Sequence, residues 1–206
     1  MKRAIDLALA IPAFVLLLPA MVAIGIWVRR DSPGPALFRQ ERIGAHGRPF
    51  QMLKFRTMVV GAQQMGAGLA VDANDSRITR AGAFLRRVSL DELPQLWNVI
   101  AGHMSVVGPR PTVAAQVARY SPTQRRRLEA RPGITGLAQV RGRAAVPWSQ
   151  RIEMDVEYVD RWSPTLDLSI LLRTIWVVLR RDGTYKGDTG GFDLPPADEE
   201  RAPSAK

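Results

Sequence analysis

The longest apolar run of the chain lies at its N-terminus. Residues 4–28 are almost wholly apolar, and Asp6 is the only charged residue among them. A run of this length can cross a hydrocarbon core of about 30 Å as a helix. Pro12 and Pro19 fall inside the run, and an interior proline removes a helix hydrogen bond and bends the helix. The pattern therefore predicts a membrane helix with one or two bends.

Basic residues flank both ends of this run, with Lys2-Arg3 before it and Arg29-Arg30 after it. Because Lys and Arg prefer the cytoplasmic side of a membrane, a re-entrant helix that bends and returns keeps both pairs there. A signal anchor with a single span is the alternative, and it places one pair on the far side. A cleaved signal peptide is disfavoured, since the run ends in bulky Trp27 and two arginines instead of small residues.

Shorter patterns follow the membrane run. Residues 36–38 and 49–58 read as extended segments, and the glycines between them indicate a hairpin. Apolar residues at helical spacing predict a short helix over 78–87, and a second over 93–100 that ends near Gly102.

The last third of the chain predicts further helices. One helix, or a pair broken at Ser121-Pro122, covers residues 112–128, whose basic run at 125–127 is expected to be solvated. A polar helix covers 149–162. Residues 166–179 carry one apolar stripe, which suits a helix in the membrane interface with Trp176 at headgroup level; packing on the soluble core is the alternative.

These patterns predict a mainly α fold with a few short strands, of the α+β class. Residues 1–31 are expected to form the membrane helix, 32–186 a cytoplasmic catalytic domain, and 187–206, rich in Gly, Pro and acids, a disordered tail. The absence of cysteine excludes disulfides and thiolate metal sites. The net charge of +10 implies an anionic partner. Nucleic acid, lipid headgroups and phosphorylated substrates are all anionic, and charge alone does not distinguish them.

Candidate chemistry concentrates in residues 86–111, where Arg86 is followed by the adjacent carboxylates Asp91 and Glu92. Ser89 and Glu92 fit the S-x-x-E capping box, so both acids can be explained as a helix start. An ionised Asp is also a nucleophile that needs no general base, and a neighbouring carboxylate can hold Mg²⁺ together with substrate phosphates. The two interpretations are compatible.

Several ordered motifs in the chain resemble one family. DSRITR at residues 75–80, LRRVSLDELPQLWNVIAGHMSVVGPRP at 85–111 and RPGITGLAQVRGR at 131–143 are similar to the bacterial sugar transferases that are monotopic phosphoglycosyl transferases. The similarity extends to KRAIDLALA at residues 2–10 and FQMLKFRTM at 50–58, so it covers nearly all of the chain except the tail.

The resemblance implies roles for single residues. Asp91 is the expected nucleophile and Glu92 the expected Mg²⁺ ligand. The membrane helix is expected to break at Pro19, although Leu18 stands where many relatives carry Ser. The remaining expected substrate-binding residues are Arg86 for the lipid phosphate, Lys54, Arg110 and Arg143 for the nucleotide sugar, and Pro111 and Asp155 at motif positions.

The resemblance also implies an activity. A phosphosugar passes from a UDP-sugar to polyprenyl (undecaprenyl) phosphate through a covalent aspartyl intermediate, with release of UMP, as the first membrane step of glycoconjugate assembly. The expected partners are these two substrates and membrane lipids, not nucleic acid, and the expected place is the cytoplasmic face of the bacterial inner membrane. A membrane-anchored nucleic-acid-binding protein and a non-catalytic scaffold are the alternatives from other classes.

Overall fold

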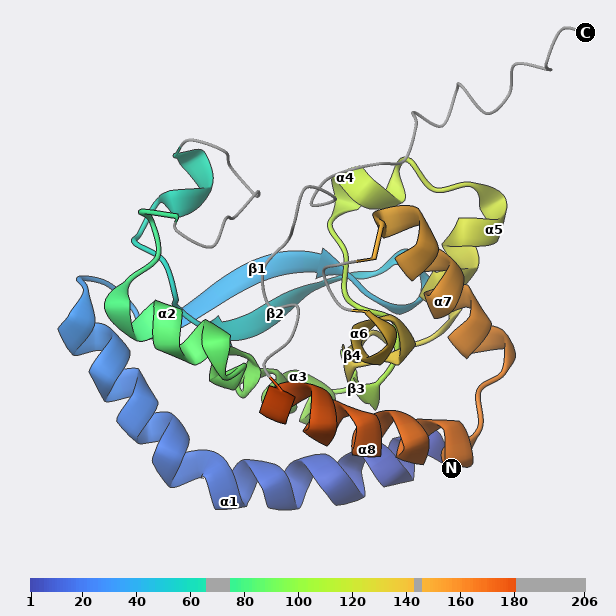
Figure 1. Ribbon diagram of the computed structural model, residues 1–206, viewed down its shortest axis with the longest axis horizontal. Coiled ribbons are helices and arrows are strands. Elements are labelled where there is room, and N and C mark those ends of the chain that lie inside the picture. The colour runs from blue at the N-terminus through green and yellow to red at the C-terminus, as the bar shows by residue number, and fades with distance from the viewer. Residues whose placement is uncertain (66–74, 143–145, 181–206) are drawn as a thin grey trace, which may run out of the picture.

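The computed structural model describes residues 1–65, 75–142 and 146–180. One long helix, α1, runs along the edge of a mainly helical domain with a few short strands (Figure 1), so the predicted fold class is confirmed in its secondary structure. In chain order the first elements are α1 (Lys2–Asp31), β1 (Leu37–Ile43), η1 (Ala45–Gly47), β2 (Pro49–Phe55), η2 (Ala62–Gln64), α2 (Arg80–Arg87), η3 (Leu90–Glu92) and α3 (Gln95–Ile100). They are followed by β3 (Ser105–Val107), α4 (Ala114–Val117), α5 (Pro122–Arg125), η4 (Arg126–Glu129), β4 (Gly133–Thr135), α6 (Leu137–Arg141), α7 (Trp148–Asp160) and α8 (Pro164–Arg180).

The apolar N-terminal run forms α1, which contains Pro12 and Pro19 and is visibly bent in Figure 1. Its most apolar 18-residue window has a mean hydropathy of 2.6, and by length and composition the helix can cross a membrane. Leu9, Val15 and Leu16 on its outer side are exposed. The inner side packs against the domain, because Ala10 is buried in a cluster with residues of β2 and α3.

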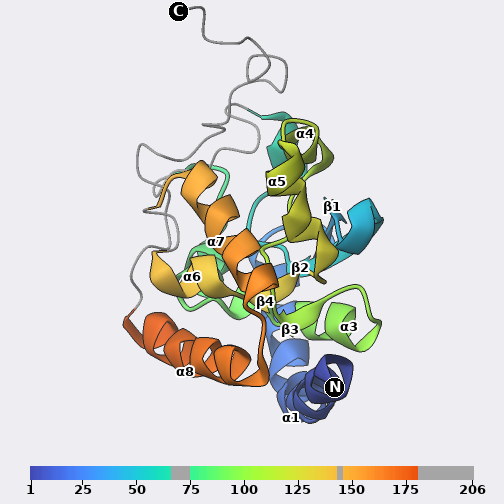
Figure 2. The ribbon, with the colours of Figure 1, turned by 90° about the vertical axis from the view of Figure 1, so that its right-hand side faces the viewer.

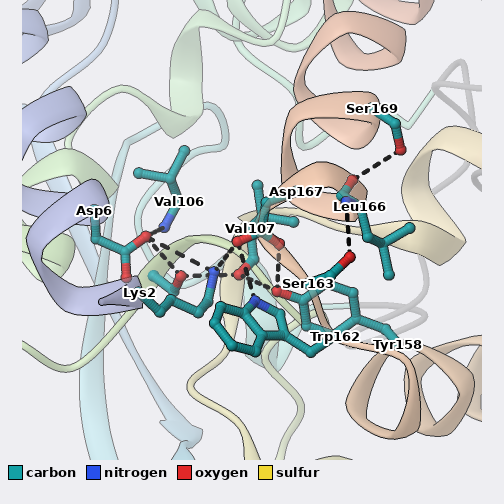
Figure 3. A network of polar contacts seen from close by, with 11 residues as sticks. Lys2, Asp6, Val106, Val107, Tyr158, Trp162, Ser163, Leu166, Asp167 and Ser169 are labelled. Carbon is teal, nitrogen blue, oxygen red and sulfur yellow. Dashed lines mark hydrogen bonds and ion pairs between the residues drawn. The ribbon is translucent and has the colours of Figure 1, made fainter.

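Buried polar contacts hold the N-terminal end of α1 on the domain (Figure 3). Lys2 Nζ lies 2.7 Å from Asp167 Oδ2 at the start of α8. Asp6 Oδ1 accepts hydrogen bonds from Ser105 Oγ at 2.8 Å and from the Val106 backbone N–H at 3.0 Å. The start of α1 is therefore fixed to both α8 and β3.

The C-terminal end of α1 is held by the same domain. Asp31 Oδ2 accepts a hydrogen bond of 2.9 Å from the backbone N–H of Ala81 in α2. The buried guanidinium of Arg56 donates to the carbonyl oxygens of Ser32, Pro33 and Pro35 at 2.8, 2.5 and 2.7 Å. Both ends of the apolar helix are thus tied to one domain.

The predicted hairpin is present as β1 and β2, which pair antiparallel from Leu37 opposite Phe55 to Ile43 opposite Pro49. Asn98 fixes this hairpin to α3, because its side chain accepts a hydrogen bond from the Leu53 N–H at 2.9 Å and donates one to the Gln51 carbonyl at 2.8 Å. The hairpin and α3 therefore form one unit, and this unit carries the acidic pair.

A second sheet was not predicted. The three-residue strands β3 and β4 pair in parallel, with Ser105 opposite Gly133 and Val107 opposite Thr135. Gly108 and Gly133 allow the two segments to approach closely, because a Cβ on Gly108 would lie 2.3 Å from the Arg131 carbonyl oxygen. Strands this short carry too few alternating positions for a sequence pattern to reveal them.

The helix α8 has one face on the core and one face exposed. Its apolar side chains Leu168, Leu172, Ile175, Trp176 and Leu179 are exposed, whereas Ile170 is buried in the core. The helix therefore packs on the core through Leu166, Ile170 and Leu171, and the rest of the apolar stripe is left uncovered. Figure 2 shows α8 and α1 together on one side of the molecule, with the rest of the domain on the other.

Two further expectations concern the surface. The run at residues 125–127 is not uniformly solvated, since Arg127 is 2% exposed and pairs with Asp155. The predicted disordered tail at 187–206 lies outside the described residues.

Candidate active site

The backbone between α2 and α3 presents the acidic pair. The helix α2 begins at Thr79, whose side chain accepts from the Gly82 N–H at 3.0 Å, and it ends at Arg87. Ser89 then adopts a left-handed conformation with φ of 58°, which turns the chain into the 3₁₀ segment η3 with Asp91 and Glu92. Pro94 directly precedes α3.

The capping-box interpretation of this segment is wrong. The Ser89 side chain makes no cap hydrogen bond, and Glu92 turns to cations of other segments instead of back to Ser89. The positive φ of Ser89 accounts for this, because a helix N-cap residue normally has extended backbone angles. A capping box is present elsewhere, between Ser121 and Gln124 at the start of α5.

Glu92 is held by two cations from distant parts of the chain. Its Oε1 accepts from Lys54 Nζ of β2 at 2.7 Å and from Arg110 Nη2 of the Pro-Arg-Pro turn at 2.9 Å. The Glu92 and Lys54 side chains are 18% and 19% exposed, and that of Arg110 is 45% exposed. Burial by itself raises the pKa of Glu92, but Arg110 and Lys54 outweigh it and hold the pKa well below its usual value. Glu92 is therefore ionised at neutral pH.

Asp91 differs from its neighbour. Across residues 1–65, 75–142 and 146–180, its carboxylate makes no hydrogen bond or ion pair, although it is half-buried. Burial raises the pKa of Asp91, and the charge of Glu92 adds to the increase, while Lys54, Arg86 and Arg110 oppose it. A carboxylate with a raised pKa and no hydrogen-bond donor is a better nucleophile than a solvated one.

Arg42 completes the cationic surroundings and was not predicted from the sequence. Its guanidinium donates to Gln40 Oε1 at 2.6 Å and to the Pro111 carbonyl at 3.5 Å. Burial lowers the pKa of Arg42 to about 10, with Arg110 contributing and Glu92 opposing, so the group stays charged at neutral pH. The pairing of the hairpin is the feature that could have indicated Arg42. Alternate residues of a strand and the residues paired with them lie on one face of the sheet, which places Gln40, Arg42 and Lys54 on the same face.

The structure brings most of the predicted site residues together. Lys54 and Arg110 contact Glu92 directly. Arg86 lies in the last turn of α2, where its charge acts on Asp91, and its side chain makes no hydrogen bond within the described part of the chain. Pro111 is buried beside Arg42.

Two predicted residues lie elsewhere, and a third is not among the described residues. Asp155 of α7 is buried and pairs with Arg127, so it stands behind Arg110 instead of at the surface of the site. Arg143 lies outside the described residues. Pro19 lies inside α1, where the expected break was placed.

The chemistry of Glu92 fits a single carboxylate ligand for Mg²⁺. The described residues contain no group of three or more Asp, Glu, His or Cys side chains that could hold a metal. Mg²⁺, however, is commonly held by one or two carboxylates together with substrate phosphates. Lys54 and Arg110 both contact Oε1 of Glu92, and no donor contacts Oε2 among the described residues, so Oε2 is the candidate ligand.

Comparison with known proteins now decides the family. The model of the bacterial sugar transferase family matches residues 1–181. The chain belongs to the bacterial sugar transferase family. The carboxylates, their cations and α1 all lie within the matched residues.

Curated members of the bacterial sugar transferase family are similar over about nine tenths of the chain. It is 45% identical to a UDP-galactose-lipid carrier transferase of Erwinia amylovora and 41% identical to an undecaprenyl-phosphate galactose phosphotransferase of Salmonella typhimurium, in each case over 199 residues. The chain spans 42% of the length of both proteins. It is 44% identical to a UDP-glucose:undecaprenyl-phosphate glucose-1-phosphate transferase of Caulobacter vibrioides, where it covers 72% of the relative.

Proposed function

We propose that this chain transfers a phosphosugar from a UDP-sugar to polyprenyl phosphate, with release of UMP. The observation that carries the proposal is the contrast between Asp91, which has no partner among the described residues, and Glu92, which two cations hold. The names of the relatives support the same substrates. They give no support to a nucleic-acid-binding protein or a non-catalytic scaffold.

The reaction divides into two displacements at phosphorus. In the first, an Asp91 carboxylate oxygen attacks the phosphorus that bears the sugar, a P–O bond forms, and the bond from that phosphorus to the bridging oxygen breaks. The electron pair leaves with UMP, and Asp91 carries the phosphosugar as an acyl phosphate. In the second, an oxygen of polyprenyl phosphate attacks the same phosphorus, the bond to Asp91 breaks, and polyprenyl diphosphosugar leaves.

The cations serve the charges of these steps. Lys54, Arg42 and Arg110 surround the carboxylates and are placed to bind the diphosphate of the donor. The Arg86 side chain makes no hydrogen bond or ion pair among the described residues, and it is the candidate for binding the lipid phosphate. Mg²⁺ held at Glu92 would neutralise negative charge on the leaving phosphate. Arg143 remains a residue predicted to bind the nucleotide sugar.

Membrane placement follows from the apolar surface. The acceptor's phosphate lies at the membrane interface while its chain remains in lipid, so the nucleophile must lie close to the interface. The helices α1 and α8 lie on one side of the molecule (Figure 2), and both carry exposed apolar side chains, which supports membrane attachment there. Because both ends of α1 are bound to one domain, we propose that the helix is re-entrant and that the domain lies on the cytoplasmic face.

Cysteine labelling tests this topology, because the chain contains no cysteine. A cysteine in a short segment added before Met1 and, separately, a cysteine in place of Arg30 are each expected to react only from the cytoplasmic side, and neither change removes the Lys2–Asp167 or the Asp31–Ala81 contact of α1. Labelling of one site from the periplasm and the other from the cytoplasm would demonstrate a single span.

The covalent step is tested without an acceptor. Purified protein with Mg²⁺ and a UDP-sugar, chosen by screening a panel, is expected to release about one UMP per active site and then stall. Asp91→Asn keeps the size of the side chain but loses the nucleophile, so it is expected to fold and to release no UMP. Intact-mass measurement should show one phosphosugar on Asp91 of the wild type.

The matched control is Asp160→Asn, an exposed carboxylate of α7 that pairs with Arg126, and it should leave the burst unchanged. Retention of the burst by Asp91→Asn would show that another group is the nucleophile. Turnover with acceptor but no burst without it would indicate direct transfer through a ternary complex.

A further inference from the structure

Arg127 is buried directly behind the Pro-Arg-Pro turn. Its Nη2 donates to the carbonyl oxygen of Arg110 at 2.9 Å and also to Asp155 Oδ2, and its Nη1 donates to the Tyr120 hydroxyl. The residue is 2% exposed, so it has no access to substrate. It contacts instead the backbone of Arg110, whose side chain binds Glu92.

Two separate segments hold this guanidinium in place. Asp155 comes from α7 and supplies the opposite charge. Tyr120 follows α4, and its hydroxyl also contacts Thr112 Oγ1 at 3.2 Å. Thr112 lies two residues after Arg110, so the cluster holds the turn at two points. The Trp148 ring lies 5.8 Å from the guanidinium and covers it.

The charge state of the cluster suits this role. Burial raises the pKa of Asp155 to about 6, and Arg127 opposes the increase, so the carboxylate remains mostly ionised at neutral pH. An ionised pair is what keeps a buried guanidinium stable, because an unpaired buried charge is strongly destabilising. The Asp155 side chain therefore supports Arg127, and the backbone and charge of Arg110 also act on this carboxyl and help to lower its pKa.

We propose that Arg127, held by Asp155 and Tyr120, is a positioning residue that directs the Arg110 side chain onto Glu92. The proposal rests on the proposed transferase function and identifies how its donor-binding cation is oriented. Arg110 has a half-exposed side chain and one hydrogen bond to Glu92, so its own contacts constrain it weakly. Its carbonyl, bound to Arg127, fixes the backbone from which the side chain extends.

Neighbouring arginines provide a matched test. Arg127→Lys keeps the charge but cannot reach the Arg110 carbonyl, Tyr120 and Asp155 together, because Lys has one nitrogen. It is expected to slow the single-turnover release of UMP at least tenfold, with a cooperative melting transition retained. Arg126→Lys, which alters an exposed pair with Asp160, is expected to stay within twofold of the wild type.

A double-mutant cycle separates positioning from general stability. If Arg127 acts through the Arg110 side chain, Arg127→Lys should have less than a twofold further effect in an Arg110→Ala background. Removing one such donor costs about 10²–10³-fold, so Arg110→Ala remains measurable in single-turnover experiments. An equal loss in both backgrounds, or no loss from Arg127→Lys alone, would overturn the proposal.

Two milder variants keep the test decisive if Arg127→Lys does not fold. Tyr120→Phe removes one acceptor and Asp155→Asn removes the opposing charge, and both are subject to the same cycle with Arg110→Ala, with Asp160→Asn as the control. Failure of the proposed function is distinguishable, because then the wild type itself releases no UMP or Asp91→Asn still does.

Discussion

Replacement of Arg56 by Lys is expected to destabilise the junction between α1 and the catalytic domain. Three nitrogens of Arg56 donate to three carbonyl oxygens just beyond the end of α1, on Ser32, Pro33 and Pro35, at 2.5–2.8 Å. A lysine carries one nitrogen at the end of its stem and can satisfy about one of these acceptors. The substitution preserves the charge and isolates the effect of the planar donor array.

The size of the effect follows from the bonds lost. A hydrogen bond to a charged group contributes about 1.5–3 kcal/mol. Two lost bonds at the lower end of this range give a loss of about 3 kcal/mol in the free energy of unfolding. For a chain of this size, 1 kcal/mol moves the melting temperature by about 2–4 °C, so the expected decrease is about 6–12 °C.

Thermal unfolding in detergent, followed by tryptophan fluorescence or circular dichroism, measures this decrease. Arg48→Lys is the matched control, since the Arg48 side chain is exposed and makes no hydrogen bond or ion pair within the described residues; the melting temperature of this variant should change by less than about 1 °C. A decrease below about 2 °C for Arg56→Lys would refute the reasoning, because it would mean that water replaces the guanidinium at little cost.

Three further predictions concern packing, pH and metal. Gly82→Ala should lower the melting temperature, although alanine favours helices by about 1 kcal/mol, because the new Cβ would lie 2.0 Å from the Thr57 carbonyl oxygen; a rise would refute this contact. The rate of UMP release should fall on the acid side as Asp91 protonates, above its ordinary pKa of 3.8. Since Lys54 lowers that pKa, Lys54→Met should move the acid limb of the residual activity to higher pH, and a move to lower pH would contradict the assignment. Chelation should stop UMP release and excess Mg²⁺ should restore it, whereas full activity in chelator would exclude a metal requirement.

Elements with a local cause were predictable from the sequence. The apolar helix was expected to end at residue 31, and α1 ends at Asp31, because Pro33 and Pro35 break a helix and Gly34 between them disfavours it. The hairpin was predicted from two extended runs around glycines, and it pairs as β1 and β2. These features depend on neighbours within a few residues, so their causes are visible in the chain.

The capping box shows how a local pattern misleads. Ser89 and Glu92 have the right spacing and residue types, yet Glu92 binds Lys54 and Arg110, which lie 38 and 18 residues away. Two charged hydrogen bonds outweigh the single bond that a cap would provide. Distant partners decided the outcome, and no local pattern reports them.

Arg127 makes the same point for burial. Within residues 125–127, three like side chains are adjacent, and nothing in the sequence distinguishes the exposed Arg126 from the buried Arg127. The distinction arises because Asp155 lies on α7, 28 residues further on, and the packing of α7 brings it to Arg127. A buried cation requires such a partner, and only the folded chain supplies it.

By itself, the sequence determined the apolar helix, the hairpin, the adjacent carboxylates and the cations needed near them, because residue type and short-range spacing encode all of these. Only the tertiary structure decided that Glu92 is bound while Asp91 has no partner among the described residues, that Arg42 joins the site, and that both ends of α1 return to one domain. Each of these depends on contacts between segments far apart in the chain, and such contacts form only when the core packs and removes the competing water.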